Sequence, residues 1–318
     1  MTTSVLLPFV PRKAEQVIPF AALVESTAAA RLWQGHAILV DALHGFAAAA
    51  GAGFRVPTGL GVGLLPFRHP LDAAHQVRSL ALATGQPVVA GFGPGAQQTQ
   101  AALRGEPYAS PLTACREYVE IVRDLLDGRR VERAGRYFVC DAQMVMVPAP
   151  PVEIGLGVLR PGMARLAGEV ADVAITWLTP PAYVRDVLVP ALAEGAAAVG
   201  RPTPRIAAIV PAALTRKSHS PADLLLAGNL AHLQAPHYAD MLRLAGVAYA
   251  PDDLELTAAR AVEAGVLLHG DVEAIAAGVA DYRAAGVDEV VLNTTGVCNT
   301  FGAREALADC RTLVTARA

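Results

Sequence analysis

The chain has 318 residues, of which 53% are hydrophobic and 17% charged, and its net charge is −3. This acidic balance argues against a nucleic-acid partner, which needs a basic surface. No apolar run is long enough for a membrane helix and residues 1–9 lack the marks of a secretory signal, so we expect a cytoplasmic protein without membrane contact. Four widely spaced cysteines predict reduced thiols rather than disulfides.

Eight short segments rich in β-forming residues alternate with helical patterns. In chain order they are SVLLPF from Ser4, ARLWQG from Ala30, RVPTGLGVGLL from Arg55, PVVAGFG from Pro87, VEIGLG from Val152, DVAITW from Asp172, RIAAIVPAAL from Arg205 and DEVVLN from Asp288. This alternation predicts an α/β protein in which residues 1–318 form a single (β/α)8 TIM barrel. A doubly wound open sheet has the same pattern and stays open as an alternative.

The helical pattern after the third segment is the clearest. Apolar residues recur at helical spacing over residues 71–84, Asp72 stands in the first turn, and Pro70 lies at the entry. A later helical stretch stops near Gly128 and leads to residues 135–147, which are additional to the alternating pattern. We expect an insertion between strands four and five there, as a small hairpin or an extended segment.

Residues 88–96, VVAGFGPGA, look like a strand that runs into a glycine-rich turn. Such a turn is typical of dinucleotide-binding folds, where glycines let the backbone approach a pyrophosphate. Here the third glycine comes one residue early, and Glu106 is the only acid in the stretch that follows. The pattern therefore argues against a dinucleotide site.

Basic residues follow four of the predicted strands, in turns that contain no Asp or Glu. They are Arg12 and Lys13 after strand one, Arg68 and His69 after strand three, Arg160 after strand five, and Arg216 and Lys217 after strand seven. In a barrel these strand ends surround the active site, so a positively charged rim that suits an anionic ligand is expected. Ordinary surface charge is the alternative interpretation.

Five sequence blocks occur in the order of a known family. They are RLWQGHA (31–37), GVGLLPFRHPLDAAHQVRSLALATGQPVVAGFGPG (61–95), EYVEIVRDLLDGRRVERAGRYF (117–138), RPGMARLAGEVADVAITW (160–177) and GVDEVVLN (286–293). Together they resemble the luciferase-like flavin- and F420-dependent oxidoreductases of the bacterial luciferase superfamily. The resemblance implies an enzyme with a TIM barrel, a mid-chain insertion, and coenzyme F420 or FMN bound at the carboxyl-terminal mouth of the barrel.

The resemblance also implies a catalytic residue. His36 matches a histidine after strand two that F420-dependent members keep near the reactive edge of the ring, where an imidazole can pass a proton. The preceding residue, often an acid in the family, is Gly35 here. A histidine that merely lines the barrel mouth is the alternative.

Further residues of the resemblance concern the cofactor ring. Gly63 and Leu64 match a place where the family commonly has a non-proline cis peptide bond behind the ring. Gly93, at the end of strand four, matches a position where a small residue lets the ring or its chain lie close to the backbone. An ordinary glycine at a bend of a barrel strand is the alternative at Gly63.

The segment of Leu159, Arg160, Pro161 and Gly162 matches the loop and helix start that hold the cofactor phosphate, where free N–H groups favour an anion. Family members usually have small residues near Leu159 and Arg160, so this chain departs from the pattern there.

Three residues near strand ends are expected in the substrate pocket, namely Trp33, Arg68 and Trp177, and Asn293 lies near another strand end. No histidine spacing matches a metal site, so no metal is expected. Cations at four strand ends suit the long anionic tail of F420 and favour it over FMN.

We therefore expect an F420H2-dependent reductase that delivers hydride to an activated C=C or C=N bond of a small-molecule or modified-peptide substrate, with dehydroalanine as one candidate. The alternatives are an FMNH2- and O2-dependent monooxygenase and a non-catalytic flavin-binding barrel. Similar proteins are often dimers, so a homodimer through an apolar face of the second and third helices is a further expectation.

Overall fold

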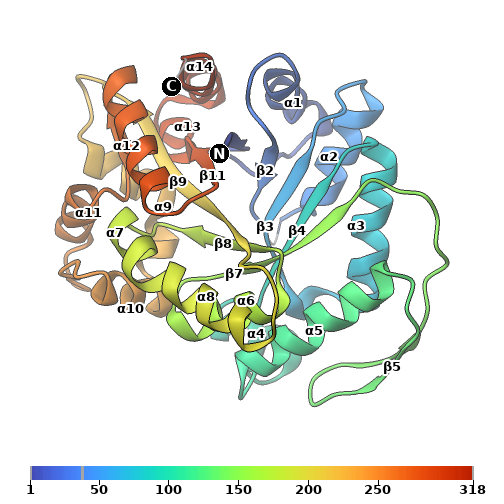
Figure 1. The fold of residues 1–318 in the computed structure, drawn as a ribbon. Helices are drawn as coiled ribbons and strands as arrows, with labels where there is room; N and C mark the ends of the chain where they lie inside the picture. The colour runs from blue at the N-terminus through green and yellow to red at the C-terminus, as the bar shows by residue number, and fades with distance from the viewer. Residues whose placement is uncertain (1, 37–38, 317–318) are drawn as a thin grey trace.

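The computed structural model describes residues 2–36 and 39–316. It contains a nine-stranded parallel sheet, of which eight strands close into a barrel (Figure 1). Their bounds are β1 (Thr2–Leu6), β2 (Leu32–Gln34), β3 (Thr58–Leu64), β4 (Val88–Gly93), β7 (Val152–Gly157), β8 (Val173–Trp177), β9 (Arg205–Leu214) and β11 (Glu289–Asn293). β1 pairs with both β2 and β11, and β8 pairs with β9, so the sheet has no open end. The predicted (β/α)8 barrel is confirmed, and the open sheet is excluded.

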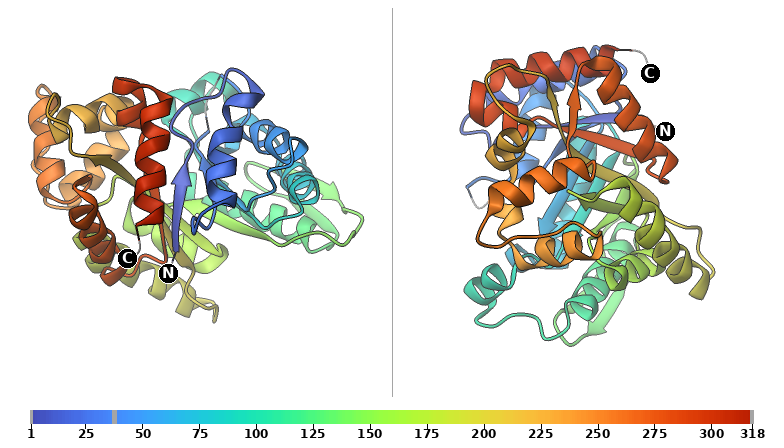
Figure 2. Two further views of the ribbon diagram at one scale, coloured as in Figure 1. Left: turned by 90° about the horizontal axis from the view of Figure 1, so that it is seen from above. Right: turned by 90° about the vertical axis from the view of Figure 1, so that its left-hand side faces the viewer.

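Helices surround this barrel on its outer face, as the two further views in Figure 2 show. They are α1 (Ile18–Glu25), α2 (Ala42–Gly51), α3 (Pro70–Thr84), α4 (Gln97–Arg104), α5 (Pro111–Leu126), α6 (Pro161–Val170), α7 (Pro181–Tyr183), α8 (Val189–Ala198), α9 (Pro221–Leu233), α10 (Pro236–Leu244), α11 (Leu254–Glu263), α12 (Val272–Ala284), α13 (Thr295–Phe301) and α14 (Ala303–Thr315). α3 begins at Pro70 and ends before Gly85, whose φ of 66° suits glycine. The helix predicted over residues 71–84 is thus confirmed.

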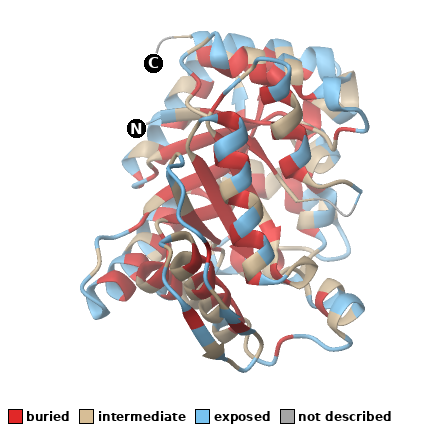
Figure 3. Ribbon diagram, turned by 90° about the vertical axis from the view of Figure 1, so that its right-hand side faces the viewer, coloured by how far each residue is buried: buried red, intermediate tan, exposed pale blue. Residues whose placement is uncertain are grey.

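The barrel strands are buried on both faces. Every residue of β4 and of β11 is buried, because helices cover the outside and side chains fill the inside. The strands accordingly appear as a continuous buried layer beneath half-exposed helices (Figure 3). A cluster of interior side chains fills the barrel, formed by Leu6, Trp33, Val89, Val173, Ile175, Ala207, Ile209 and Val291.

The amino-terminal end of the barrel is closed by a buried carboxylate. Glu289, the first residue of β11, accepts hydrogen bonds of 2.7 Å from Ser4 Oγ and from Trp33 Nε1. It also pairs with Arg205 at 2.7 Å and with Arg31 at 3.4 Å. These side chains come from four different strands or strand entries, so one acid ties the strands together at this end.

The expected insertion lies between α5 and β7. It is an antiparallel hairpin of β5 (Val131–Ala134) and β6 (Val139–Ala142), followed by an extended stretch that returns along α3 (Figure 1). The hairpin begins earlier than the expected residues 135–147. An additional short strand, β10 (Leu268–Gly270), pairs with the end of β9 outside the closed barrel and was not expected from the sequence.

Within residues 2–36 and 39–316, none of the helices combines the length and the apolar character that crossing a bilayer requires.

Candidate active site

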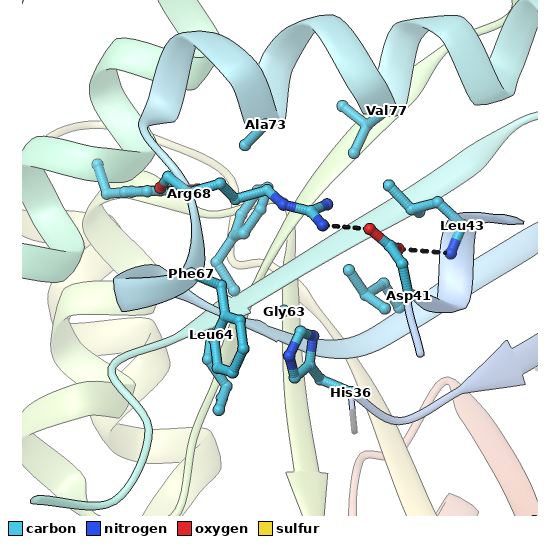
Figure 4. Close-up of a pocket in the computed structure, with 12 residues that line it drawn as sticks. His36, Asp41, Leu43, Gly63, Leu64, Phe67, Arg68, Ala73 and Val77 are labelled. Carbon is cyan, nitrogen blue, oxygen red and sulfur yellow. Dashed lines mark hydrogen bonds and ion pairs between the residues drawn. The ribbon is translucent and has the colours of Figure 1, made fainter. Parts of the chain in front are cut away.

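A small cavity lies at the carboxyl-terminal mouth of the barrel, next to β3 and β4 (Figure 4). Its volume is about 20 Å³, which is room for one water molecule. Four of the residues expected at the site line it together, namely His36, Gly63, Leu64 and Arg68. The fold therefore brings together residues that lie 27 to 32 positions apart in the sequence.

His36 follows β2 and packs against the ring of Phe67, with 4.4 Å between ring centroids. Its Nε2 atom is buried and has no hydrogen-bond partner among the described residues. Burial lowers the pKa of His36 from its ordinary 6.5, and the charge of Arg68 lowers it further, while Asp41 opposes the shift. The imidazole is therefore mainly neutral at pH 7 and has a ring nitrogen available for a ligand.

Arg68 is held in place by partners from outside its own turn, one of which is an acid. Its guanidinium pairs with Asp41 (Figure 4), and it donates a 2.6 Å hydrogen bond to Gln76 Oε1. Asp41 also caps α2 by accepting from the Leu43 N–H at 2.9 Å. Burial opposes ionisation of Asp41, but the bonds from Leu43 and Arg68 keep its pKa below the ordinary value.

The expected positively charged rim is partly neutralised, because the cations at two of its four positions are paired with acids. Besides Arg68, Arg216 is tied to Asp309 by two 2.8 Å hydrogen bonds. The sequence argument considered only acids within each turn. It missed these two because they lie at or in other helices, Asp41 at the start of α2 and Asp309 in α14. Arg160 differs, because the one acid that its exposed guanidinium contacts among the described residues is Asp240, at a long 3.4 Å.

A bulge in β3 shapes the floor of the mouth. The peptide bond between Gly61 and Val62 is cis, and the pairing register of β3 with β4 shifts between Leu60 and Gly63. The cis bond thus lies two residues before the expected pair of Gly63 and Leu64, and that expectation is corrected. Both of these residues still line the small cavity.

The Val62 side chain fills the space beside Gly93. A Cβ atom added at Gly93 would lie 2.9 Å from Val62 Cγ2, closer than real Cβ contacts allow. A Cβ at Gly157 would meet Val62 at 3.5 Å. A side chain at position 93 would therefore force Val62 to shift, whether or not a ligand ring lies there. Val62 is only partly buried and packs against the apolar side chains that fill the barrel.

The expected phosphate-binding segment follows β7, the strand next to β4. Arg160 is the extended residue before α6, and Pro161 is the first residue of that helix. The carbonyl oxygen of Leu159 is fixed by a 2.9 Å hydrogen bond from the Tyr183 hydroxyl. A Cβ at Gly162 would meet its nearest neighbour, Leu112, at 3.8 Å, so packing alone does not require glycine there. The helix start and the exposed Arg160 make this a suitable place for an anion.

Trp33 does not lie where it was expected. It is fully buried in the barrel interior, and its indole N–H donates to Glu289 at the closed amino-terminal end. Alternation along β2 points Trp33 into the barrel, whereas Gln34, the next residue, faces α2. The substrate-pocket role expected for Trp33 is therefore corrected to a core-packing role.

Trp177 ends β8 at the mouth and is accompanied by residues that the sequence did not single out. Its indole N–H donates to Asn229 Oδ1 at 3.0 Å, and the ring of His232 stacks on it at 4.9 Å with an interplanar angle of 18°. Both partners come from α9, more than fifty residues later in the chain. No local motif marks them, since their roles depend on how α9 packs across the mouth.

Comparison with known proteins places this geometry in a family context. Residues 1–289 match the model of the luciferase-like monooxygenase family. One curated relative is the 5,10-methylenetetrahydromethanopterin reductase of Methanopyrus kandleri, 29% identical over 150 residues, which are 42% of this chain and 43% of the relative. Another is the F420-dependent glucose-6-phosphate dehydrogenase of Nakamurella multipartita, 39% identical over 88 residues, 27% of this chain and 26% of the relative. The matched stretches thus span less than half of these relatives.

Solved structures share the fold over the whole chain. An F420-dependent secondary alcohol dehydrogenase in complex with an F420–acetone adduct has a TM-score of 0.77 at 17% identity, covering 100% of this chain and 99% of that one. A monooxygenase from Streptomyces bottropensis has a TM-score of 0.73 at 19% identity, covering 99% and 98%. At these identities the likeness establishes the barrel alone. The family model, which matches residues 1–289, shows that the chain belongs to the luciferase-like monooxygenase family.

Proposed function

We propose that this protein is an F420H2-dependent reductase that delivers hydride to an activated C=C or C=N bond of a small-molecule or modified-peptide substrate. The observation that carries the proposal is the buried Nε2 atom of His36, which lacks a partner among the described residues at the barrel mouth. A buried polar atom without a partner is costly, so it suggests a ligand group that completes it. The relatives whose names include F420 support the choice of cofactor.

The residues present fit a deazaflavin with an anionic tail. Val62 on its bulge offers an apolar surface for the ring, and Gly63 adds no side chain beside it. The exposed guanidinium of Arg160 and the start of α6 suit a phosphate. When bound in its reduced form, F420 supplies a hydride.

His36 would move the proton that accompanies the hydride. Reduction of a double bond adds a hydride to one atom and a proton to the other, and the proton is finally replaced from solvent. Since the pKa of His36 is lowered, its neutral form holds one ring proton and can exchange it through Nε2 or its other nitrogen. The aromatic contact with Phe67 fixes the plane of the ring while this occurs.

An FMNH2- and O2-dependent monooxygenase is the second candidate, because a solved monooxygenase has the same barrel. It predicts a preference for FMN and consumption of O2. A non-catalytic barrel would bind cofactor without turnover, and dehydroalanine in a peptide is the narrower candidate substrate for the reductase.

The cofactor is tested by titrating the purified protein with F420 and with FMN at low and moderate salt. F420 should bind at micromolar concentration or tighter and FMN more weakly. Arg160→Ala should weaken F420 binding about tenfold at low salt, and the difference should shrink at higher salt, because a charge-assisted phosphate contact is lost.

Arg165→Ala is the matched control, since Arg165 is an exposed arginine on the same helix that pairs with Glu194. It should leave F420 affinity unchanged. Preference for FMN together with O2 consumption would favour the monooxygenase instead, and equal effects of the two substitutions would remove Arg160 from the site.

A further inference from the structure

The indole of Trp177 spans the barrel mouth. Trp177 ends β8, and β8 and β2 stand four strands apart in a closed barrel of eight, which places them on opposite sides. Nevertheless, a Cβ atom added at Gly35, directly after β2, would lie 3.7 Å from Cη2 and Cζ3 of Trp177. The benzene edge of the indole therefore reaches across to the segment that carries His36 and lies at contact distance from Gly35.

Two side chains of α9, Asn229 and His232, hold the indole of Trp177 in this position. Asn229 is 2% exposed, accepts from the indole N–H at 3.0 Å, and donates from Nδ2 to the Leu225 carbonyl oxygen at 3.2 Å. Its backbone leaves helical geometry, with φ −139° and ψ 17°, so the helix bends where it holds the tryptophan. His232 stacks on the indole, and Tyr238 meets His232 edge-on with centroids 5.1 Å apart.

The resulting wall is flat and uncharged near neutral pH. Burial lowers the pKa of His232 to about 4, and His237 adds to the shift, so the stacked imidazole is neutral at pH 7. The single polar atom of Trp177 is already bonded to Asn229. On the opposite side, Asp41 is engaged by Arg68 and the Leu43 N–H. The indole that an acceptor beside Trp177 meets therefore has no free N–H of its own.

We propose that Trp177 determines substrate specificity and selects acceptors whose double bond belongs to a flat, uncharged, conjugated system, such as an α,β-unsaturated carbonyl compound. This proposal rests on the proposed reductase function. A flat conjugated group gains contact by lying against an aromatic surface, whereas hydroxyl or phosphate groups lose water there without gaining a partner from the indole. Asn229 is a positioning residue, because it acts through Trp177.

The reaction that follows from this selection is a two-electron reduction. The acceptor gains a hydride at the carbon β to its carbonyl group and a proton at the α carbon, its C=C π bond is lost, and the reduced deazaflavin is the electron donor. Conjugation flattens the acceptor and also makes its β carbon electrophilic. The flat acceptors that Trp177 selects are therefore also those that accept a hydride readily.

The test measures binding and turnover with defined probes. Three probes are compared: 2-cyclohexenone, which is flat and uncharged, a dihydroxylated cyclohexenone, and fumarate, which is charged. Calorimetry measures the binding of each probe to the protein loaded with oxidised F420. The kcat/KM of each probe is then measured with F420H2. The wild type should favour 2-cyclohexenone at least tenfold. Trp177→Leu should reduce that preference about tenfold through a higher KM, with F420 affinity unchanged, whereas Trp177→Phe, which keeps an aromatic ring, should retain most of it.

Asn229 gives an independent readout. Asn229→Asp keeps an acceptor oxygen for the indole N–H and should preserve the preference, while Asn229→Leu should lose it and shift the Trp177 emission. Equal binding of the three probes by a wild-type protein that binds F420, or an unchanged preference in Trp177→Leu, would overturn the specificity proposal alone. Failure of the wild type to bind F420 would overturn the proposed function and this proposal with it.

Discussion

Burial is the largest cause of the lowered pKa of His36, and two charged neighbours from different elements modify it further. Arg68, after β3, lowers its pKa, and Asp41, before α2, raises it. Because Arg68 and Asp41 also pair with each other, removal of either charge changes both the pairing and the field at the imidazole. The state of His36 therefore depends on the intact pair.

Arg68→Gln should raise the pKa of His36, because one cause of the lowering is lost while Asp41 continues to favour the protonated form. The acid limb of the kcat/KM profile should then move to higher pH, and NMR titration of the His36 ring should show the same shift. Arg78→Gln is the control, since Arg78 is a half-buried arginine on α3 that bonds the Val145 carbonyl oxygen. A profile unchanged by Arg68→Gln would show that another group governs the acid limb.

At the level of single residues, sequence reasoning found His36, Arg68, Gly63 and Leu64, which the fold gathers around one cavity. It misplaced Trp33, because nearness to a strand end does not say whether the side chain points into the barrel. That depends on alternation from a strand boundary known only to within a residue or two.

Among the elements, β3 and β4 lie so close together that β4 needs a glycine where the two strands meet. A Cβ atom at Gly91, in the middle of β4, would overlap the Leu60 carbonyl oxygen and Ile175 Cδ1. Since one of these neighbours is backbone, the strands must separate to accept it. The glycines in this part of the sheet are therefore determined by the bulge and by the barrel interior.

Gly91→Ala should destabilise the protein by about 3 kcal/mol, near the upper end of overpacking costs, as measured by chemical denaturation. Gly51→Ala is the matched control, because a Cβ at Gly51, the last residue of α2, meets nothing within 4 Å. The control should be neutral or slightly stabilising, since alanine favours helix more than glycine. Equal stability of the two variants would contradict the packing argument.

Most elements were predictable because their periodicity is strong. The eight barrel strands and α3 follow directly from alternating β-rich and helical patterns. β10 was missed because three residues, Leu-His-Gly, carry no periodic signal. The start of β5 was missed because Val131–Ala134 carries two charged residues in four and is mostly accessible to solvent.

For the molecule as a whole, closure of the barrel was not predictable from strand patterns, because an open sheet has the same ones. The barrel is closed because the first strand, β1, pairs in parallel with the last, β11. Glu289 contributes to this closure, since its partners come from β1, β2, β9 and the entry to β2. Burial opposes its ionisation, but Arg31, Ser4 and Trp33 lower its pKa.

Glu289→Gln should therefore destabilise the fold by roughly 3 kcal/mol, because two partly buried arginines lose their shared buried carboxylate. In the wild type this contribution should be complete above the ordinary glutamate pKa of 4.5 and be lost as the pH falls through the lower folded-state value. Urea denaturation from pH 7 to pH 3 measures both effects.

Glu132→Gln is the control, because Glu132 and its partner Arg130 are 70% and 55% exposed. Exposed pairs contribute at most about 1 kcal/mol, so this variant should behave as the wild type. A Glu289→Gln protein with wild-type stability at pH 7 would show that the remaining pairs with Glu153 suffice for the two arginines.

Because Glu289 and its partners fill the amino-terminal end of the barrel, the candidate site lies at one end of the molecule only, the mouth. The candidate site lies at the mouth, so the loops at the opposite end of the barrel stand apart from it. Residues 199–204, which join α8 to β9, lie at that end. An enzyme anchored to an electrode or bead through this loop would keep its mouth turned toward the solution, and the loop is where a reporter domain is best inserted.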